Sequence, residues 1–173
     1  TAMMYQLRCA CTAIMFALSV STAIGSHQTR LNEPLNLTYG VGYGDGKCMS
    51  TDDCVRKETP SLNVVECWFS VTPATLSPDG FSRDGFVVNH KFPGPCIEAV
   101  EGDTIRVHFV SEIPSMLHWH GFHQKANPQM DGTPLTQCHT VPNRPMIYEM
   151  IAEPGTHWWH SHFHDDKSMQ ALD

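Results

Sequence analysis

The sequence is poor in basic residues and contains no stretch in which they gather. Its 173 residues include 11 Lys and Arg against 18 Asp and Glu, so the net charge is −7 with histidine neutral. Because nucleic-acid binding needs positive charge concentrated on one surface, we expect no nucleic-acid partner. Internal repeats, low-complexity tracts and amphipathic helices of useful length are absent too. With 41% hydrophobic and 17% charged residues, the composition is typical of a folded globular domain.

Hydrophobic residues form only one long run, and it lies close to the first residue. The run "CACTAIMFALSVSTAIG" occupies residues 9–25, follows the basic Arg8 and ends in small residues. This arrangement is typical of a secretory signal peptide. We therefore predict cleavage of residues 1–25, a secreted extracellular product and no membrane contact afterwards. The alternative is a membrane anchor, although Ser, Thr and Cys dilute the run and leave it short for a span.

Cysteines of a secreted protein are expected to form disulfides. Five cysteines follow the predicted signal peptide, and all are disulfide candidates: Cys48, Cys54, Cys67, Cys96 and Cys138. An odd number leaves one thiol free or paired outside this set. Asn36 begins an Asn-Leu-Thr glycosylation sequon, which fits the same compartment.

The amino-acid composition of the chain changes after its first third. Residues 26–63 are polar and rich in glycine, with no helical or strand period, and are predicted to form an extension rather than a domain. After them, short runs such as "VVECWFSV", "TIRVHFV" and "MIYEMIA" alternate with turn sequences such as "SPDG", "EGD" and "EPG". Such a pattern predicts an all-β sandwich or barrel. In "TIRVHFV", the alternation places Ile105, Val107 and Phe109 on one face of a strand.

Histidines crowd into the last part of the chain, where nine of the eleven lie in the range 108–164. Two pairs have one residue between them, His118 with His120 in "LHWHGF" and His160 with His162 in "THWWHSHF". In a strand, such residues share a face, with Cα atoms about 6.6 Å apart, so both imidazoles can reach one metal or two neighbouring metals. Imidazoles without Cys or carboxylate favour Cu, Zn, Fe or Ni, and affinity is greatest for copper. The alternative is an exposed strand with solvated histidines.

Several motifs together resemble one known family. "LHWHGFHQ", "MDGTP", "TQC" and "PGTHWWHSH" are similar in order and spacing to the multicopper oxidases, the laccase and ferroxidase family. The upstream "FPGPCIEAVEGDTIRVHFV" is similar to a strand pair of that family's first domain. The likeness covers about residues 84–173. It implies that residues 64–173 form a cupredoxin-like Greek-key β-sandwich, the first domain of a multi-domain enzyme, incomplete at its C-terminal end.

The resemblance also implies roles for individual residues in a trinuclear copper cluster. His118 would bind the type 2 copper, and the paired type 3 coppers would be bound by His120, His160 and His162. Asp131, in "MDGTP", matches an acidic residue that stabilises and protonates bound oxygen species beside the cluster. A simple Asp-Gly turn is the alternative for this residue.

Other residues near the motifs are not expected to bind metal. His164 is expected to be solvated, and His123 and His157 to form hydrogen bonds or packing contacts. "QCH" at 137–139 invites comparison with a type 1 copper element but lacks the flanking histidine, so a disulfide is predicted for Cys138. The neighbouring tryptophans are expected to pack in the core or around the cluster: Trp119, Trp158 and Trp159.

The family resemblance implies a secreted oxidase that takes single electrons from phenols, aromatic amines, Fe(II) or Cu(I) and reduces O₂ to water. Its type 1 copper and remaining cluster ligands would lie in a later domain, because no second histidine pair followed by His-Cys-His occurs here. We expect these residues alone to be inactive. Two alternatives are a cupin or carbonic-anhydrase-type zinc or iron enzyme and a non-catalytic copper-binding sandwich. A cupin usually has a carboxylate a few residues after its histidine pair, and here none precedes Asp131.

Overall fold

Runs of β-branched and aromatic residues form strands in the computed structural model, which describes residues 38–39, 49–60 and 62–163. The strands are β1 (Thr38–Tyr39), β2 (Cys54–Glu58), β3 (Asn63–Leu76), β4 (Arg83–Val88), β5 (Lys91–Phe92), β6 (Thr104–Ser111), β7 (Leu117–His120), β8 (Met146–Ile151) and β9 (Trp158–Ser161). The only helix among the described residues is a 3-10 turn, η1 (Pro128–Met130). None of the described helical segments is long and apolar enough to cross a membrane. The all-β prediction is confirmed.

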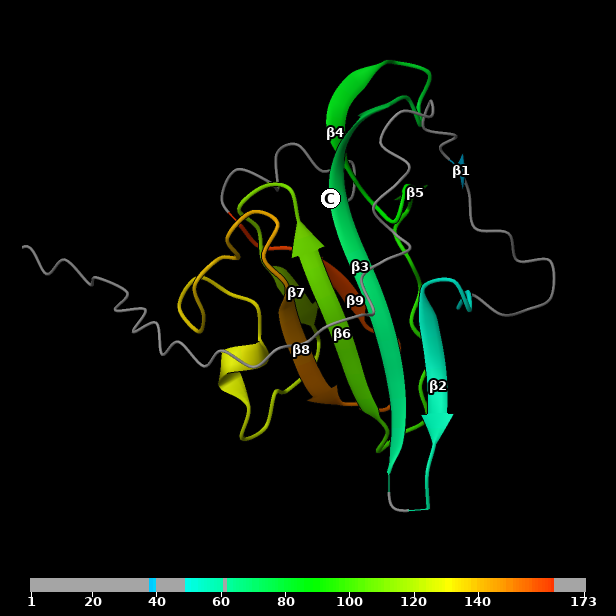
Figure 1. The fold of residues 1–173 in the computed structure, drawn as a ribbon, viewed down its shortest axis with the longest axis vertical. Coiled ribbons are helices and arrows are strands. Elements are labelled where there is room, and N and C mark those ends of the chain that lie inside the picture. Colours follow the sequence, from blue (N-terminus) through cyan, green and yellow to red (C-terminus); the bar gives the residue numbers. More distant parts are fainter. Residues whose placement is uncertain (1–37, 40–48, 61, 164–173) are drawn as a thin grey trace, which may run out of the picture. The chain divides into compact units, whose positions relative to one another are not determined.

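The strands form two sheets. Seven of them make one sheet in the order β1-β5-β4-β3-β6-β8, with β2 pairing beside β3. Strand β3 runs parallel to β6 and antiparallel to β2 and β4, and β6 is antiparallel to β8 (Figure 1). The other two strands, β7 and β9, pair antiparallel in a sheet of their own.

Strand β2 was not expected, because the sequence before residue 63 shows no strand period. It nevertheless pairs with β3 through five residue pairs, from Cys54 opposite Cys67 to Glu58 opposite Asn63. Only its first residue is buried, so the alternation that predicts a strand is missing. The main sheet therefore extends into the segment that the sequence predicted to be an extension.

Disulfides account for the cysteines that the structure describes. Cys54 and Cys67 are joined across β2 and β3. Cys96 and Cys138 are disulfide-bonded as well. The predicted signal peptide, Asn36 and Cys48 lie outside the described residues, so those predictions stand as they were.

The core lies between the two sheets. As predicted, Ile105, Val107 and Phe109 of β6 are buried on one face. The fully buried Tyr148 of β8 packs edge-on against Phe109, with ring centroids 6.0 Å apart, and against Trp119 of β7 at 5.4 Å. The small sheet is thus attached to the large one through aromatic side chains.

The tyrosine hydroxyl also fixes the position of β7. Tyr148 Oη accepts a hydrogen bond from the Leu117 backbone N–H at 3.0 Å and another from Gln137 Nε2 at 2.9 Å. Burial raises the pKa of Tyr148, so the phenol stays neutral. Leu117 directly precedes His118, and this buried hydrogen bond therefore holds the start of the histidine strand.

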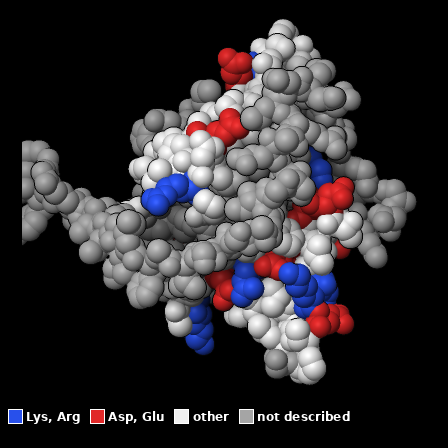
Figure 2. All heavy atoms as spheres, viewed as in Figure 1, with Lys and Arg blue, Asp and Glu red and all other residues white. Residues whose placement is uncertain are grey.

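The opposite face of the large sheet carries ion pairs. Glu66 of β3 pairs with Lys57 of β2, and its Oε1 lies 2.8 Å from His108 Nε2 of β6. Hydrogen bonds from Lys57 and then His108 lower the pKa of Glu66. Arg106 contacts Glu149 of β8 at 2.7 Å. In Figure 2, most of the described Lys and Arg residues that are visible lie next to Asp or Glu, and they do not form a patch of one sign.

Candidate metal centre

The two histidine motifs fall on the paired strands β7 and β9. Their register places His118 opposite His160 and His120 opposite Trp158. Because alternate residues of a strand share a face, His118, His120 and His160 project to the same side of the pair, and Trp119 turns into the core. The antiparallel pairing therefore gathers side chains that lie 40 residues apart in the sequence.

These three imidazoles meet closely enough to share a metal ion. One ring nitrogen from each of His118, His120 and His160 lies within 4.8 Å of the others. His162, just beyond β9, joins them, with its ring centroid 5.2 Å from that of His118 and 5.8 Å from that of His160. All four histidines predicted to be ligands are thus brought together by the fold. Their assignment to particular coppers stays a prediction.

The loop that carries Asp131 orients the His118 ring. His118 Nδ1 donates a hydrogen bond to the Asp131 backbone carbonyl at 2.7 Å. A carbonyl can only accept, so Nδ1 carries the proton in the neutral ring and the lone pair of Nε2 is left for a metal. The Asp131 carboxylate is more distant, with Oδ1 3.6 Å from Nδ1. Asp131 therefore contacts a predicted ligand, mainly through its backbone.

His160 is held in a similar way. Its Nδ1 donates to the carbonyl oxygen of Ser161 at 2.7 Å, which leaves Nε2 without a proton in the neutral ring. That Nε2 lies 3.3 Å from His120 Nδ1. His160 is buried, whereas His120 is exposed. Two ring nitrogens on different strands therefore face one another, the arrangement that a shared metal site needs.

Trp158 packs against two of the histidines. Its ring lies nearly parallel to His160, with centroids 4.1 Å apart, and to His120 at 4.8 Å. Trp159 points the other way, where its Nε1 donates to the Pro95 carbonyl at 3.0 Å. The predicted packing roles of Trp119, Trp158 and Trp159 are confirmed.

A glycine allows the Asp131 loop to lie directly on β7. Gly132 has φ +76, and a Cβ there would lie 1.6 Å from the Leu117 carbonyl oxygen. No other residue fits this approach. The close contact keeps the Asp131 carbonyl beside His118, and "MDG" in the sequence indicates the turn but not what it touches.

The remaining histidines are not part of the described cluster. His157 packs on Phe122, with ring centroids 4.5 Å apart, and His123 hydrogen-bonds to Glu153. Both roles agree with the prediction. His139 contacts Phe163 rather than a histidine. His164 lies outside the described residues.

The all-β fold of two sheets is cupredoxin-like, as in the solved multicopper oxidases that it resembles, and its clustered imidazoles could hold a metal ion. The family model described as multicopper oxidase matches residues 70–172 of the chain. The chain belongs to the multicopper oxidase family.

Individual relatives agree with this membership. Laccase-1 of Cryptococcus neoformans var. grubii is 45% identical over 103 residues, and dihydrogeodin oxidase of Aspergillus terreus is 38% identical over 154 residues. These matches cover 57% and 83% of this chain. Among solved structures, the laccase from Botrytis aclada has a TM-score of 0.58 at 34% identity and covers 61% of the chain.

The chain corresponds to a limited part of these proteins. It spans 16% of the Cryptococcus laccase, 25% of dihydrogeodin oxidase and 21% of the Botrytis laccase chain.

The described residues fit the copper that the family name implies. The donor set consists of imidazoles alone, which suit copper in both of its common oxidation states. Two of the rings have Nδ1 hydrogen-bonded to a backbone carbonyl, so in each neutral ring Nε2 carries the lone pair that a metal would accept.

Proposed function

We propose that this chain is the N-terminal part of a secreted laccase-like multicopper oxidase and supplies four histidine ligands of its trinuclear copper cluster. The observation that carries the proposal is the meeting of His118, His120 and His160, whose ring nitrogens lie within 4.8 Å of one another. Membership of the multicopper oxidase family and the names of the laccase and oxidase relatives support it.

Each histidine has a proposed role. His118 would hold the type 2 copper, and His120, His160 and His162 the paired type 3 coppers. Bound copper supplies one-electron redox chemistry, so that single electrons from a reducing substrate can be used to reduce O₂ to water. Asp131 Oδ1, 3.6 Å from His118 Nδ1, is the proposed proton-holding group beside the cluster.

Residues around the cluster orient the histidine rings without a bound metal. Backbone carbonyls fix the ring protons of His118 and His160 on Nδ1. Trp158 covers one side of His120 and His160 and limits water there. A preorganised set of rings costs little further ordering when metal binds.

The proposed whole enzyme has further parts. Other cupredoxin domains of the same protein would complete the cluster and carry the type 1 copper, and this chain by itself would be inactive. Its reducing substrate would be a phenol, an aromatic amine or Fe(II). Secretion is proposed from the N-terminal segment alone.

The first experiment is to purify the full-length protein that contains this chain and to measure its copper content together with oxygen uptake. Near four coppers per chain, with uptake driven by a phenol or by Fe(II), is the expected result. His118→Ala should abolish uptake and lower the copper content. His90→Asn is the control, because His90 is an exposed turn residue at φ 59, a conformation that asparagine accepts.

Other outcomes identify the alternatives. Copper without substrate-driven uptake would favour a non-catalytic copper-binding sandwich. Zinc or iron at the same histidines would refute the copper proposal and favour a hydrolytic or oxygenase site. The second result is not expected, because the chain belongs to the multicopper oxidase family and imidazole donors bind copper more tightly than zinc or iron.

A further inference from the structure

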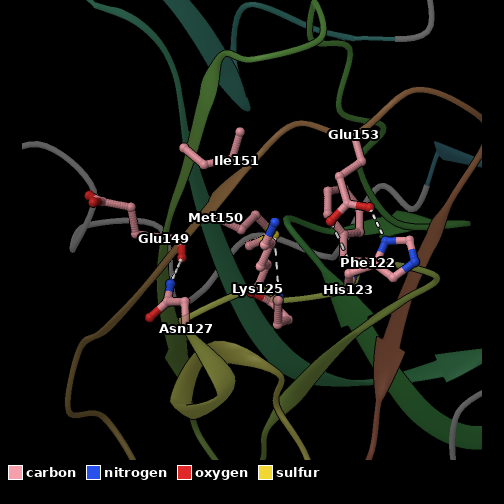
Figure 3. A pocket seen from close by; sticks show the side chains of 9 residues that line it. Phe122, His123, Lys125, Asn127, Glu149, Met150, Ile151 and Glu153 are labelled. Atoms are coloured by element: carbon pink, nitrogen blue, oxygen red, sulfur yellow. Dashed lines mark hydrogen bonds and ion pairs between the residues drawn. The ribbon is translucent and has the colours of Figure 1, made fainter.

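One contact outside the histidine cluster joins the segment that leaves β7 to the segment that enters β9. Glu153 Oε1 accepts the backbone N–H of His123 at 3.0 Å, and Glu153 Oε2 pairs with His123 Nδ1 at 2.5 Å. Figure 3 shows the carboxylate turned toward His123 at one end of a groove. The hydrogen bond from His123 lowers the pKa of Glu153, so the carboxylate is ionised at neutral pH and both bonds are charge-assisted.

The strands that carry the ligands need such support. β7 and β9 share only four residue pairs, and no ladder among the described residues connects them to the seven-stranded sheet. A two-stranded pair of this size is marginally stable by itself. A slip of one residue would turn His160 to the opposite face and remove it from His118 and His120.

The other anchors do not secure the His120 end of this ladder. Leu117 is bonded to Tyr148 and Trp159 to Pro95, so each contact ties one strand to the rest of the domain. The His162 N–H donates to the Met116 carbonyl at 3.0 Å, which closes the far end of the ladder.

At the His120 end, contacts among the described residues connect the flanking segments to each other. They are the Glu153–His123 pair and the packing of His157 on Phe122 and Gly121. The first is the polar one and involves both carboxylate oxygens. His123 lies three residues after His120, and Glu153 lies seven residues before His160. The pair is therefore close enough to both strands to influence their register.

We propose that Glu153 is a positioning residue that, together with His123, holds β7 and β9 in the register that brings the histidines together. The inference rests on the proposed copper function only for the expected change in the copper spectrum. The register is a property of the fold and is measurable without copper.

The test compares Glu153→Ala and Glu153→Gln with the unmodified full-length protein, before and after copper removal. Glu149→Gln is the matched control, because Glu149 lines the same groove but is paired with Arg106 across β6 and β8. The measurements are amide hydrogen exchange in residues 117–120 and 158–161, and the electron paramagnetic resonance spectrum of the copper-loaded protein.

We expect exchange in these two strands to rise about two- to fivefold in Glu153→Ala, because the His123 side chain is largely exposed and solvent screens its pairing with Glu153. The rise should be smaller in Glu153→Gln, which keeps one acceptor oxygen. Exchange in β3 and β6 should not change, and the copper spectrum should change in the Glu153 variants. Glu149→Gln should match the unmodified protein in the exchange of β7 and β9 and in the copper spectrum, because its ion pair lies between β6 and β8.

Two results would overturn the inference. One is equal exchange in β7 and β9 for the Glu153 variants and Glu149→Gln. The other is a uniform rise that includes β3 and β6, which would make Glu153 a general stabiliser. If Glu153→Ala does not fold, the same comparison is made with Glu153→Gln. An unmodified protein that takes up no copper would refute the proposed function, while the exchange data would still decide the role of Glu153.

Discussion

Replacing Gly132 by alanine tests whether the close approach of its loop to β7 orients the His118 ring. A Cβ at Gly132 would lie 1.6 Å from the Leu117 carbonyl oxygen and 2.3 Å from its carbon. Real Cβ atoms essentially never approach other heavy atoms within 3.0 Å, so loop and strand must separate by at least about 1.4 Å. The obstructing atoms are backbone and cannot rotate away.

Two losses contribute to the expected effect. Alanine in the left-handed conformation at φ +76 costs roughly 1–2 kcal/mol relative to glycine. The separation also breaks the bond from His118 Nδ1 to the Asp131 carbonyl, which contributes about 0.5–1.5 kcal/mol. Gly132→Ala should therefore lower the free energy of unfolding by about 1.5–3.5 kcal/mol. It should also weaken copper binding, because the His118 ring loses its orientation.

The measurement is urea unfolding of the purified protein, followed by copper content after reconstitution. Gly102→Ala is the matched control, since Gly102 has φ +88 but nothing within 4 Å of its added Cβ. It carries the backbone cost without the clash, and its copper content should be normal. Equal loss of stability in the two variants, with equal copper content, would refute the reasoning.

Two other substitutions test the scaffold around the site. Tyr148→Phe leaves the buried Leu117 N–H without its acceptor and removes one acceptor of Gln137 Nε2, and it should lower the free energy of unfolding by about 1–3 kcal/mol in urea unfolding. A loss below about 0.5 kcal/mol would contradict the buried hydrogen-bond network. Glu66 has a lowered pKa in the folded protein, so its ionised form contributes stability above its unfolded-state pKa, near 4.5, and that stability is lost as the pH falls through its folded-state pKa. Unfolding curves of the unmodified protein and Glu66→Gln should therefore converge as the pH falls below about 4.5, and a difference that is constant with pH would contradict this assignment.

Much of the fold and of the histidine site could be predicted from local sequence patterns. The alternation in "TIRVHFV" identified the buried face of β6, because strand residues two apart always share a face. The same rule identified His118 with His120 as a pair on one face. Both predictions depend on geometry within one strand, which the sequence contains in full.

Strand β2 shows where local pattern is insufficient. Its residues after Cys54 are partly or fully exposed, so no hydrophobic alternation is imposed on them. What makes the segment a strand is pairing with β3 and the disulfide between Cys54 and Cys67. A disulfide partner is not encoded in the spacing of cysteines, because five candidates allow many pairings.

The meeting of the two histidine motifs depends on relations that no single motif contains. The two-residue period of a strand specifies which residues of β9 share a face, but not which of them lies opposite His118. That register is set by contacts between distant segments, such as the close approach of Gly132 to Leu117 and the pairing of Glu153 with His123. Gly132 and Leu117 are not metal-ligand residue types, and the spacing of His123 and Glu153 does not indicate a metal site. Their contacts nevertheless constrain where an imidazole points. Substitutions at such positions should therefore change metal geometry while leaving every proposed ligand in place.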